Sequence, residues 1–169
     1  LNRDVGEYVL EHKDIKVKMK DAEAVIKVEI CNKCAYISKN NIPGMGGLPT
    51  GSTGRTVSLI SGGIDSPVAS YMMMKRGTKV TFVHFQNSNM QKEAVQGKVE
   101  ELVKVLSTYQ NGAKLYIVPF DKIQKKIITE IPARIRMILY KRLMLKISSI
   151  ITDKIKAKAM IVGDNLAQV

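Results

Sequence analysis

The stretch "LISGGIDSPVASYMMMKRG", residues 59–77, decides the fold of this chain. It continues the short apolar run "RTVSLI" (55–60), which is typical of a buried strand, and passes through two glycines into a helical pattern. Ser66 suits the N-cap of that helix, Pro67 its first position and Gly77 the position after its end. The stretch therefore predicts a strand, a tight loop and a helix.

The same order of elements repeats along the rest of the chain. Strands are predicted at "KVTFVHF" (79–85), "AKLYIVPF" (113–120) and "AKAMIVGD" (157–164). A helix is predicted over 91–109, and a long helix after Pro132 with an apolar stripe of Ile135, Ile138, Leu139, Leu143, Ile147, Ile150 and Ile151. Apolar strands that alternate with helices predict an α/β fold whose parallel sheet is covered on both faces.

The first forty residues predict a small α+β segment. The pattern of 21–38 suggests two short strands with a turn near Asn32 and Lys33. Its seven lysines predict a markedly basic segment. The next stretch, "NNIPGMGGLPTGSTGR", has the glycine and proline content of a linker. We therefore expect one domain over 1–41, a linker over 42–55 and a second domain over 56–169.

Composition limits the classes of function. The 169 residues carry a net charge of +12, which fits either a polyanionic partner or a solvated lysine-rich surface. No run approaches the roughly 20 apolar residues of a membrane helix, and no secretory leader opens the chain. Cys31 and Cys34 form a single pair, too few ligands for zinc, and are expected to be free structural thiols in a reducing cytosol. We therefore expect a cytoplasmic protein.

The loop between the first strand and the first helix has the chemistry of an anion site. Gly62 and Gly63 let backbone N–H groups approach an anion, and the helix N-terminus adds further donors. Ser61 and Ser66 add hydroxyls. Asp65 would repel phosphate unless a cation lay between them, which indicates Mg²⁺ or a role in orienting the loop. The loop holds no lysine, so it fits pyrophosphate better than γ-phosphate transfer. The alternative is a glycine turn with a helix cap.

One histidine and several cationic residues near the predicted sheet edge each fit either a structural or a ligand-binding role. His84 ends a strand on the ligand-bearing edge and fits a structural histidine as well as a nucleotide contact. Arg142 and Lys146 fall inside the apolar stripe of the long helix, and Lys141 flanks it. Cations on a buried face need a partner. A polyphosphate would supply one, and a snorkelling side chain is the alternative.

The motif SGGxDS in residues 61–66 resembles the PP-loop of N-type ATP pyrophosphatases. Together with "GGLPTGSTGR", "VHF", "VPF", "KRLMLKI" and "GDNLAQV", it resembles the tRNA 4-thiouridine synthetase (ThiI) family. The family usually has "GESLGQV" in place of the last block, so Asp164 and Ala167 are departures. The resemblance implies that 1–41 is the C-terminal part of a THUMP RNA-binding domain. It also implies that 56–169 is a PP-loop ATP pyrophosphatase domain, truncated at its C-terminus.

The resemblance also implies an ATP site with Mg²⁺. The family's ATP contacts carry over to Leu59, Ile60, His84, Phe85, Lys141 and Gly163. The predicted site adds the loop and one further cation, namely Ser61, Gly62, Gly63, Asp65, Ser66 and Arg142. Asp65 and Lys141 are expected to be catalytic, and Asp65 to bind the metal.

The activity implied by the resemblance is ATP-dependent tRNA sulfurtransfer, which makes 4-thiouridine at tRNA position 8. It implies a cysteine desulfurase as persulfide donor, a link to thiamine biosynthesis through a sulfur-carrier protein, and allows a homodimer. Neither Cys31 nor Cys34 matches the family's sulfur-carrying cysteine, so the chain alone is not expected to complete sulfur transfer. Two alternatives stay open. One is another PP-loop enzyme, a 2-thiouridylase or an amidotransferase synthetase, and the other is a non-catalytic tRNA-binding module.

Overall fold

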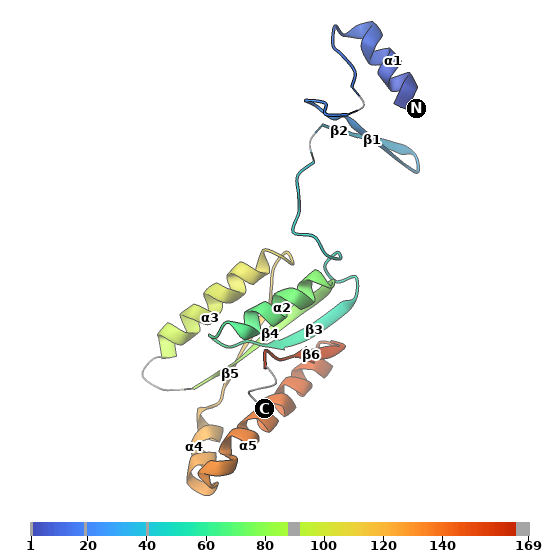
Figure 1. The fold of residues 1–169 in the computed structure, drawn as a ribbon. Helices are drawn as coiled ribbons and strands as arrows, with labels where there is room; N and C mark the ends of the chain where they lie inside the picture. The colour runs from blue at the N-terminus through green and yellow to red at the C-terminus, as the bar shows by residue number, and fades with distance from the viewer. Residues whose placement is uncertain (1, 19, 40, 88–91, 165–169) are drawn as a thin grey trace. The chain divides into compact units, whose positions relative to one another are not determined.

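A computed structural model describes residues 2–18, 20–39, 41–87 and 92–164, without the side chains of 92–94. The chain divides into two compact units, Leu1–Gly44 and Met45–Val169 (Figure 1). We call them the N-terminal unit and the sheet unit. Among the described residues, no helix combines the length and the apolar character that crossing a membrane requires.

The N-terminal unit holds one helix and one hairpin. Helix α1 spans Asn2–His12, and the antiparallel strands β1 (Lys27–Cys31) and β2 (Cys34–Ser38) confirm the two predicted strands. Asn32 adopts a left-handed φ of 52°, a conformation that asparagine tolerates in tight turns. Both cysteines are free and exposed at the ends of the strands. None of the unit's described residues is buried, so this part of the chain lacks a core of its own.

Charge divides unequally between the two units. The N-terminal unit has eight Lys or Arg and seven Asp or Glu, a net charge of +1. The sheet unit has nineteen and eight, a net charge of +11. The expectation of a markedly basic N-terminal segment is therefore wrong, because acidic residues balance its lysines. Lys27 and Glu29, for example, form an ion pair at 2.8 Å.

The sheet unit is built on four parallel strands, which confirms the predicted α/β fold. Strands β3 (Gly54–Leu59), β4 (Thr78–Gln86), β5 (Leu115–Pro119) and β6 (Ala159–Ile161) lie in the order β5-β4-β3-β6. β4 is buried along nearly its whole length, as expected of a parallel strand covered on both faces. The core gathers side chains from the strands and their covering helices, among them Ile60, Met74, Val80, Phe82, Val99, Val103, Leu106 and Ile161.

Four helices connect these strands. α2 (Asp65–Lys75) and α3 (Lys92–Ser107) lie on one face of the sheet, and α5 (Ala133–Lys154) lies on the other (Figure 1). This follows from right-handed crossovers, because the chain steps outward from β3 to β5 and then returns past both strands to β6. α4 (Asp121–Glu130) was not predicted, although Ile123, Ile127 and Ile128 stand at helical spacing in it.

The face that α5 turns toward the sheet differs from the predicted one. Ser148 and Thr152 are its buried residues, whereas Ile135, Ile138 and Ile150 of the predicted stripe are exposed. Small hydroxyl side chains let the helix approach the sheet closely. The expectation that Arg142 and Lys146 lie on a buried face is wrong as well, because both are exposed.

Candidate functional site

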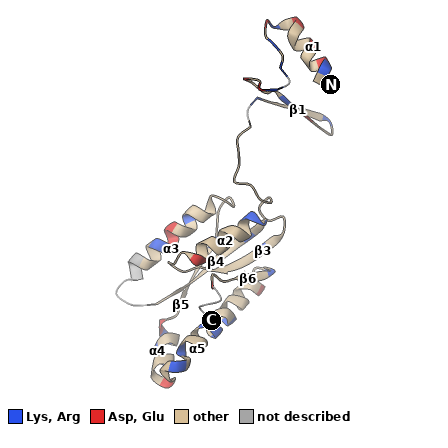
Figure 2. Cartoon of the chain, in the orientation of Figure 1, with Lys and Arg blue, Asp and Glu red and all other residues tan. Residues whose placement is uncertain are grey.

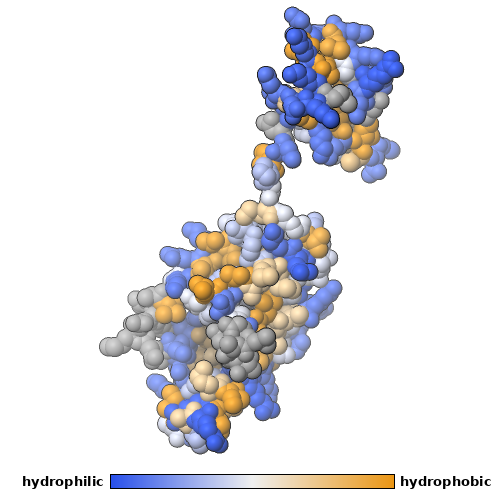
Figure 3. All heavy atoms as spheres, viewed as in Figure 1, coloured by the Kyte–Doolittle hydropathy of each residue, from blue (hydrophilic) through white to orange (hydrophobic). Residues whose placement is uncertain are grey.

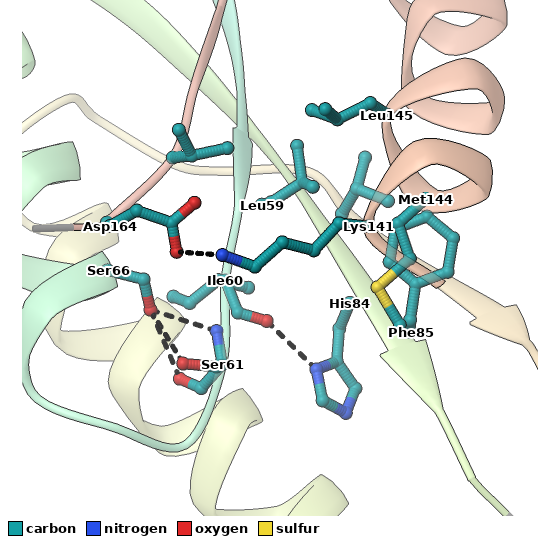
Figure 4. A pocket seen from close by; sticks show the side chains of 13 residues that line it. Leu59, Ile60, Ser61, Ser66, His84, Phe85, Lys141, Met144, Leu145 and Asp164 are labelled. Carbon is teal, nitrogen blue, oxygen red and sulfur yellow. Dashed lines mark hydrogen bonds and ion pairs between the residues drawn. The ribbon is translucent and has the colours of Figure 1, made fainter. Parts of the chain in front are cut away.

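A cavity of about 300 Å³ lies at the carboxyl ends of β3, β4 and β6 (Figure 4). The strand order reverses at β3, because β3 leads into α2 on one face of the sheet and β6 is entered from α5 on the other, and a crevice opens between these strand ends. The lining residues are Leu59, Ile60, Ser61, Ser66, Val83, His84, Phe85, Lys141, Met144, Leu145, Val162, Gly163 and Asp164. Apolar side chains thus form one wall, and hydroxyls, a lysine and a carboxylate stand at the loop.

Ser66 shapes the loop from beneath. Its side chain is buried, and its Oγ accepts a hydrogen bond from the Ser61 backbone N–H at 2.9 Å. The Ser61 and Ser66 hydroxyls also lie 3.1 Å apart. Helix α2 begins at Asp65 with Ile64 at the N-cap, so the prediction of Ser66 as N-cap is wrong. The Ser66 hydroxyl binds the loop instead, which leaves the first backbone N–H groups of α2 without a side-chain cap.

A buried chain of hydroxyls joins the loop to the sheet. Ser58 Oγ on β3 lies 2.8 Å from Ser70 Oγ on α2, and Ser70 Oγ donates to the Ser66 carbonyl at 2.7 Å. Ser58 and Ser70 are fully buried, so each needs the other as a partner. These bonds hold the start of α2 against the end of β3.

Gly163 closes the other side of the crevice. A Cβ at this position would lie 2.5 Å from the Ser66 backbone N and 2.6 Å from its Cα. Residue 163, which follows β6 and Val162, can therefore pass so close to α2 only if it is glycine. The same close approach puts residue 163 next to the N–H groups at the start of the helix.

His84 joins two strand ends. Its Nδ1 lies 2.9 Å from the Ile60 carbonyl, and because a carbonyl only accepts, Nδ1 is the donor. The ring is 7 % exposed and lines the cavity. His84 thus has a structural hydrogen bond and a place in the cavity wall, and both readings of the sequence remain compatible with its position.

Lys141 points into the cavity from α5 (Figure 4). Met144, Leu145 and the buried Ser148 follow it at the spacings of one helix face, which explains why Lys141 turns toward the sheet. Its Nζ lies 3.6 Å from Asp164 Oδ1, an ion pair in which both side chains are nearly half exposed. A lysine held in this way remains able to contact an anion.

The predicted site residues fall into two groups. Eight of them line the cavity, namely Leu59, Ile60, Ser61, Ser66, His84, Phe85, Lys141 and Gly163. Gly62, Gly63 and Asp65 belong to the adjoining loop and helix start but do not line it. Arg142 is exposed and also outside the lining. The departure noted at Ala167 lies outside the described residues.

Several residues near the site were missed by the reasoning from sequence. Met144, Leu145 and Val162 complete the apolar wall. Lys98 of α3 is close to the loop, since a Cβ at Gly62 would lie 3.7 Å from its Cδ. Lys98 is far from the loop in sequence and no motif includes it, so only the packing of α3 reveals its position.

Comparison with known families agrees with this geometry. A family model described as "Thiamine biosynthesis protein (ThiI)" matches residues 51–169. The chain belongs to the ThiI family. This confirms the resemblance seen in its motifs. Curated relatives named probable tRNA sulfurtransferase occur in Geobacillus sp. (strain WCH70), 40 % identical, and in Thermus thermophilus, 39 % identical. Each match spans the whole chain and 42 % of the relative.

Solved structures of similar proteins agree with the ThiI assignment. One is a 4-thiouridine synthetase that was solved as an RNA complex with bound ATP. The match covers 99 % of this chain and 44 % of the synthetase chain, with a TM-score of 0.76 and 32 % sequence identity. Another is PH1313 from Pyrococcus horikoshii Ot3. The match covers 75 % of this chain and 42 % of the PH1313 chain, with a TM-score of 0.57 and 34 % sequence identity. The chain thus spans less than half the length of the relatives it matches.

Proposed function

We propose that the chain is the ATP-binding part of a tRNA sulfurtransferase that adenylates a tRNA uridine, at position 8, on the way to 4-thiouridine. One observation carries this proposal: a single cavity at the reversal point of the sheet brings the SGGIDS loop, an apolar wall and Lys141 together. The names and bound ligands of the similar proteins support the same activity.

The two sides of the cavity suit the two ends of ATP. Adenine is a flat apolar ring with polar edges, and it fits the wall formed by Leu59, Phe85 and Met144. The phosphates fit the loop, where the N-terminus of α2 and the Ser61 hydroxyl offer donors. Lys141 stands beside this end and can neutralise charge on the α-phosphate.

Asp65 fits a Mg²⁺ ion shared with the phosphates. Its carboxylate is exposed at the start of α2, and no side chain in the described part of the chain pairs with it. Magnesium commonly binds through one or two carboxylates together with substrate phosphates, rather than through a cage of protein ligands. The described residues contain no group of three or more metal-binding side chains, so the phosphates would complete the coordination. Bound there, the ion would offset the charge of the departing pyrophosphate.

Adenylation makes the uridine oxygen a leaving group. The O4 atom attacks the α-phosphorus, a new O4–P bond forms, and the bond to the bridging oxygen breaks as pyrophosphate leaves. The loop donors face the charge that grows on pyrophosphate. In the second step, a persulfide sulfur supplied by a cysteine desulfurase attacks C4, and AMP departs with O4. A second thiol then cleaves the sulfur–sulfur bond, which releases 4-thiouridine as a disulfide forms. This second step needs a sulfur-carrying cysteine that neither Cys31 nor Cys34 is proposed to supply.

The tRNA would meet the sheet unit beside this cavity. Helices α4 and α5, from Asp121 to Lys154, hold nine Lys or Arg and three Asp or Glu, a net charge of +6 (Figure 2). That is half the net charge of the chain. Seven of these cations are exposed and form no ion pair within the described part of the chain: Lys122, Lys125, Lys126, Arg134, Arg142, Lys146 and Lys154. We call them the α4–α5 cations. Unpaired cations of this density favour RNA phosphates.

The mixture of hydrophilic and apolar side chains on the surface of the sheet unit is compatible with a polar partner that binds over these helices. Hydrophilic and apolar side chains are interspersed on the face that Figure 3 shows. Exposed apolar residues of α5, such as Met137 and Ile138, lie between the cations rather than replacing them. Lysine and arginine can therefore contact phosphates along both helices.

Further parts of the proposal rest on the family. Residues 1–41, which lie within the N-terminal unit, would be the C-terminal part of a THUMP domain, and 56–169 a PP-loop domain after a linker at 42–55. A sulfur-carrier protein of thiamine biosynthesis, a homodimer and a cytoplasmic location are proposed on the same basis.

The test uses the full-length protein, Mg²⁺ and α-labelled ATP, with and without tRNA and a sulfur donor. We expect labelled AMP only when tRNA is present, and 4-thiouridine in the recovered tRNA. Asp65→Ala should lower AMP formation by about 100-fold or more and leave tRNA affinity nearly unchanged. The matched control is Asp153→Ala, which removes an exposed carboxylate on α5 instead of the one on α2. Labelled ADP, or AMP formed without tRNA, would refute the proposal in favour of another enzyme. Absence of all turnover would favour a tRNA-binding module.

A further inference from the structure

The phosphate loop contains no lysine, but α3 brings one to it. Lys98 is an exposed residue of α3, and a Cβ at Gly62 would lie 3.7 Å from its Cδ, with no other atom within 4 Å. The bare backbone of Gly62 thus lies next to the aliphatic stem of Lys98. The ammonium group is two bonds beyond Cδ, which is short enough for it to reach an anion held on the loop.

Lys98 and Lys141 approach the loop from opposite faces of the sheet. Lys98 comes from α3, which lies on the same face as α2, and Lys141 comes from α5 on the other face (Figure 1). Lys141 lines the cavity and Lys98 does not. The two lysines are therefore suited to different ends of a polyphosphate that runs from the cavity across the loop.

Lys98 is not paired with Glu100 or Glu101, the acidic residues that follow it on α3. Within the described part of the chain it forms no ion pair. Glu100 is held by Gln96, whose Nε2 donates to Glu100 Oε1 at 2.7 Å, and Gln96 accepts in turn from Gln86 Nε2 at 2.7 Å. On the loop side, Asp65 adds a negative charge and Lys141 is paired with Asp164. A triphosphate on this loop needs a further cation, and Lys98 is placed to be one.

We propose that Lys98 and the backbone of Gly62 form a subsite for the β- and γ-phosphates of ATP and for the pyrophosphate that leaves. The inference rests on the proposed use of ATP. It divides the work between two lysines: Lys141 binds near the α-phosphate and the nucleoside, and Lys98 binds the departing group.

The test compares three variants of the full-length protein: Lys98→Ala, Lys98→Arg and Lys104→Ala. Lys104 is an exposed lysine further along α3 and serves as the matched control. Binding of ATP, pyrophosphate and AMP is measured for each by calorimetry with Mg²⁺ present, and thermal unfolding is recorded to show that the variants fold. We expect Lys98→Ala to weaken ATP and pyrophosphate binding roughly tenfold, while AMP binding stays within about twofold. Lys98→Arg should restore most of the loss, and Lys104→Ala should match the wild type.

The outcomes separate this subsite from the proposed function. Equal losses for ATP and AMP, or no loss for either in Lys98→Ala, would overturn the subsite while wild-type AMP formation could still stand. A wild-type protein that binds pyrophosphate through Lys98 but never forms AMP would refute the proposed reaction and retain the subsite.

Discussion

The two units of this chain hold their residues in place by different means. The sheet unit buries apolar side chains on both faces of a parallel sheet and links buried hydroxyls beneath its loop. In the N-terminal unit no described residue is buried, and the ion pairs Arg3–Glu7 and Lys27–Glu29 lie on the surface. The difference teaches that a position packed closely against backbone accepts few other side chains. An exposed position accepts many substitutions at little cost in stability.

The units differ as much in charge as in burial. The net charges of +1 and +11 show that a lysine count says little until acidic residues are subtracted. Polyanion binding depends on unpaired cations. The sheet unit therefore becomes the stronger candidate for phosphate contacts, although the N-terminal unit is the part proposed to belong to an RNA-binding THUMP domain.

A methyl group added to one glycine in each unit should give the largest contrast. Gly163→Ala puts a Cβ 2.5 Å from the Ser66 backbone, so β6 and α2 must separate. We expect the free energy of unfolding to fall by about 3 kcal/mol or more, and ATP binding to be lost. Gly6→Ala in α1 meets no atom within 4 Å and should stabilise that helix by up to about 1 kcal/mol. Thermal unfolding and ATP titration measure both, and equal effects would contradict the contrast.

Charge reversal in each unit should give the next largest difference. Replacing three α4–α5 cations by glutamate should weaken tRNA binding roughly 10- to 100-fold and lower the salt slope of log K by about 2. The substituted residues are Lys122, Lys125 and Lys126. The same exchange at Lys13, Lys16 and Lys18 of the N-terminal unit should cost less than about threefold. Filter binding over a salt series measures both triple variants. A larger loss of tRNA affinity in the N-terminal variant would assign the main phosphate contacts to the N-terminal unit instead.

Loss of one buried hydroxyl should have a moderate effect. Ser70→Ala removes the partner of the buried Ser58 Oγ and the bond to the Ser66 carbonyl. We expect a loss of about 1–3 kcal/mol in the free energy of unfolding, because Ser58 keeps an unsatisfied buried hydroxyl. Thr108→Ala, whose exposed Oγ1 bonds the Val105 carbonyl, is the control and should cost under about 0.5 kcal/mol. Chemical denaturation that finds equal losses would argue against the buried chain.

The smallest effect is expected at an exposed ion pair of the N-terminal unit. Arg3 Nε donates to Glu7 Oε1 at 2.8 Å, but both side chains are more than half exposed. Glu7→Ala should change helix stability by less than about 0.5 kcal/mol, and high salt should remove even that. Circular dichroism of the two proteins at low and high salt measures it. A loss as large as that of Ser70→Ala would show that the unit depends on its surface charges.

Reasoning from sequence succeeded where local patterns decide structure. The four strands of the sheet follow from apolar runs and α3 and α5 from apolar spacing, and Gly77, with a φ of 84°, follows α2 as predicted. It failed at α4, although Ile123, Ile127 and Ile128 of this helix stand at helical spacing and Ile127 is buried. It also failed at the start of α2, where Ser66 bonds the loop rather than the helix.

The face of α5 shows the limit more clearly. Seven apolar residues at helical spacing predicted a buried stripe, but the sheet contacts the side of Ser148 and Thr152. Spacing identifies which residues share a face, and it cannot tell which face a sheet will accept. That choice depends on how closely two elements approach.

By itself, the sequence determined the alternation of strands and helices, the parallel α/β fold and the position of the SGGIDS loop between a strand and a helix. These depend on residue periodicity and on backbone freedom at glycine, both of which act over a few neighbouring positions. Only the tertiary structure decided that Gly163 must be glycine, that Lys141 and not Arg142 enters the cavity, and that Lys98 lies next to Gly62. Each of these facts is a distance between segments far apart in the chain, and such distances exist only after the sheet has brought the segments together.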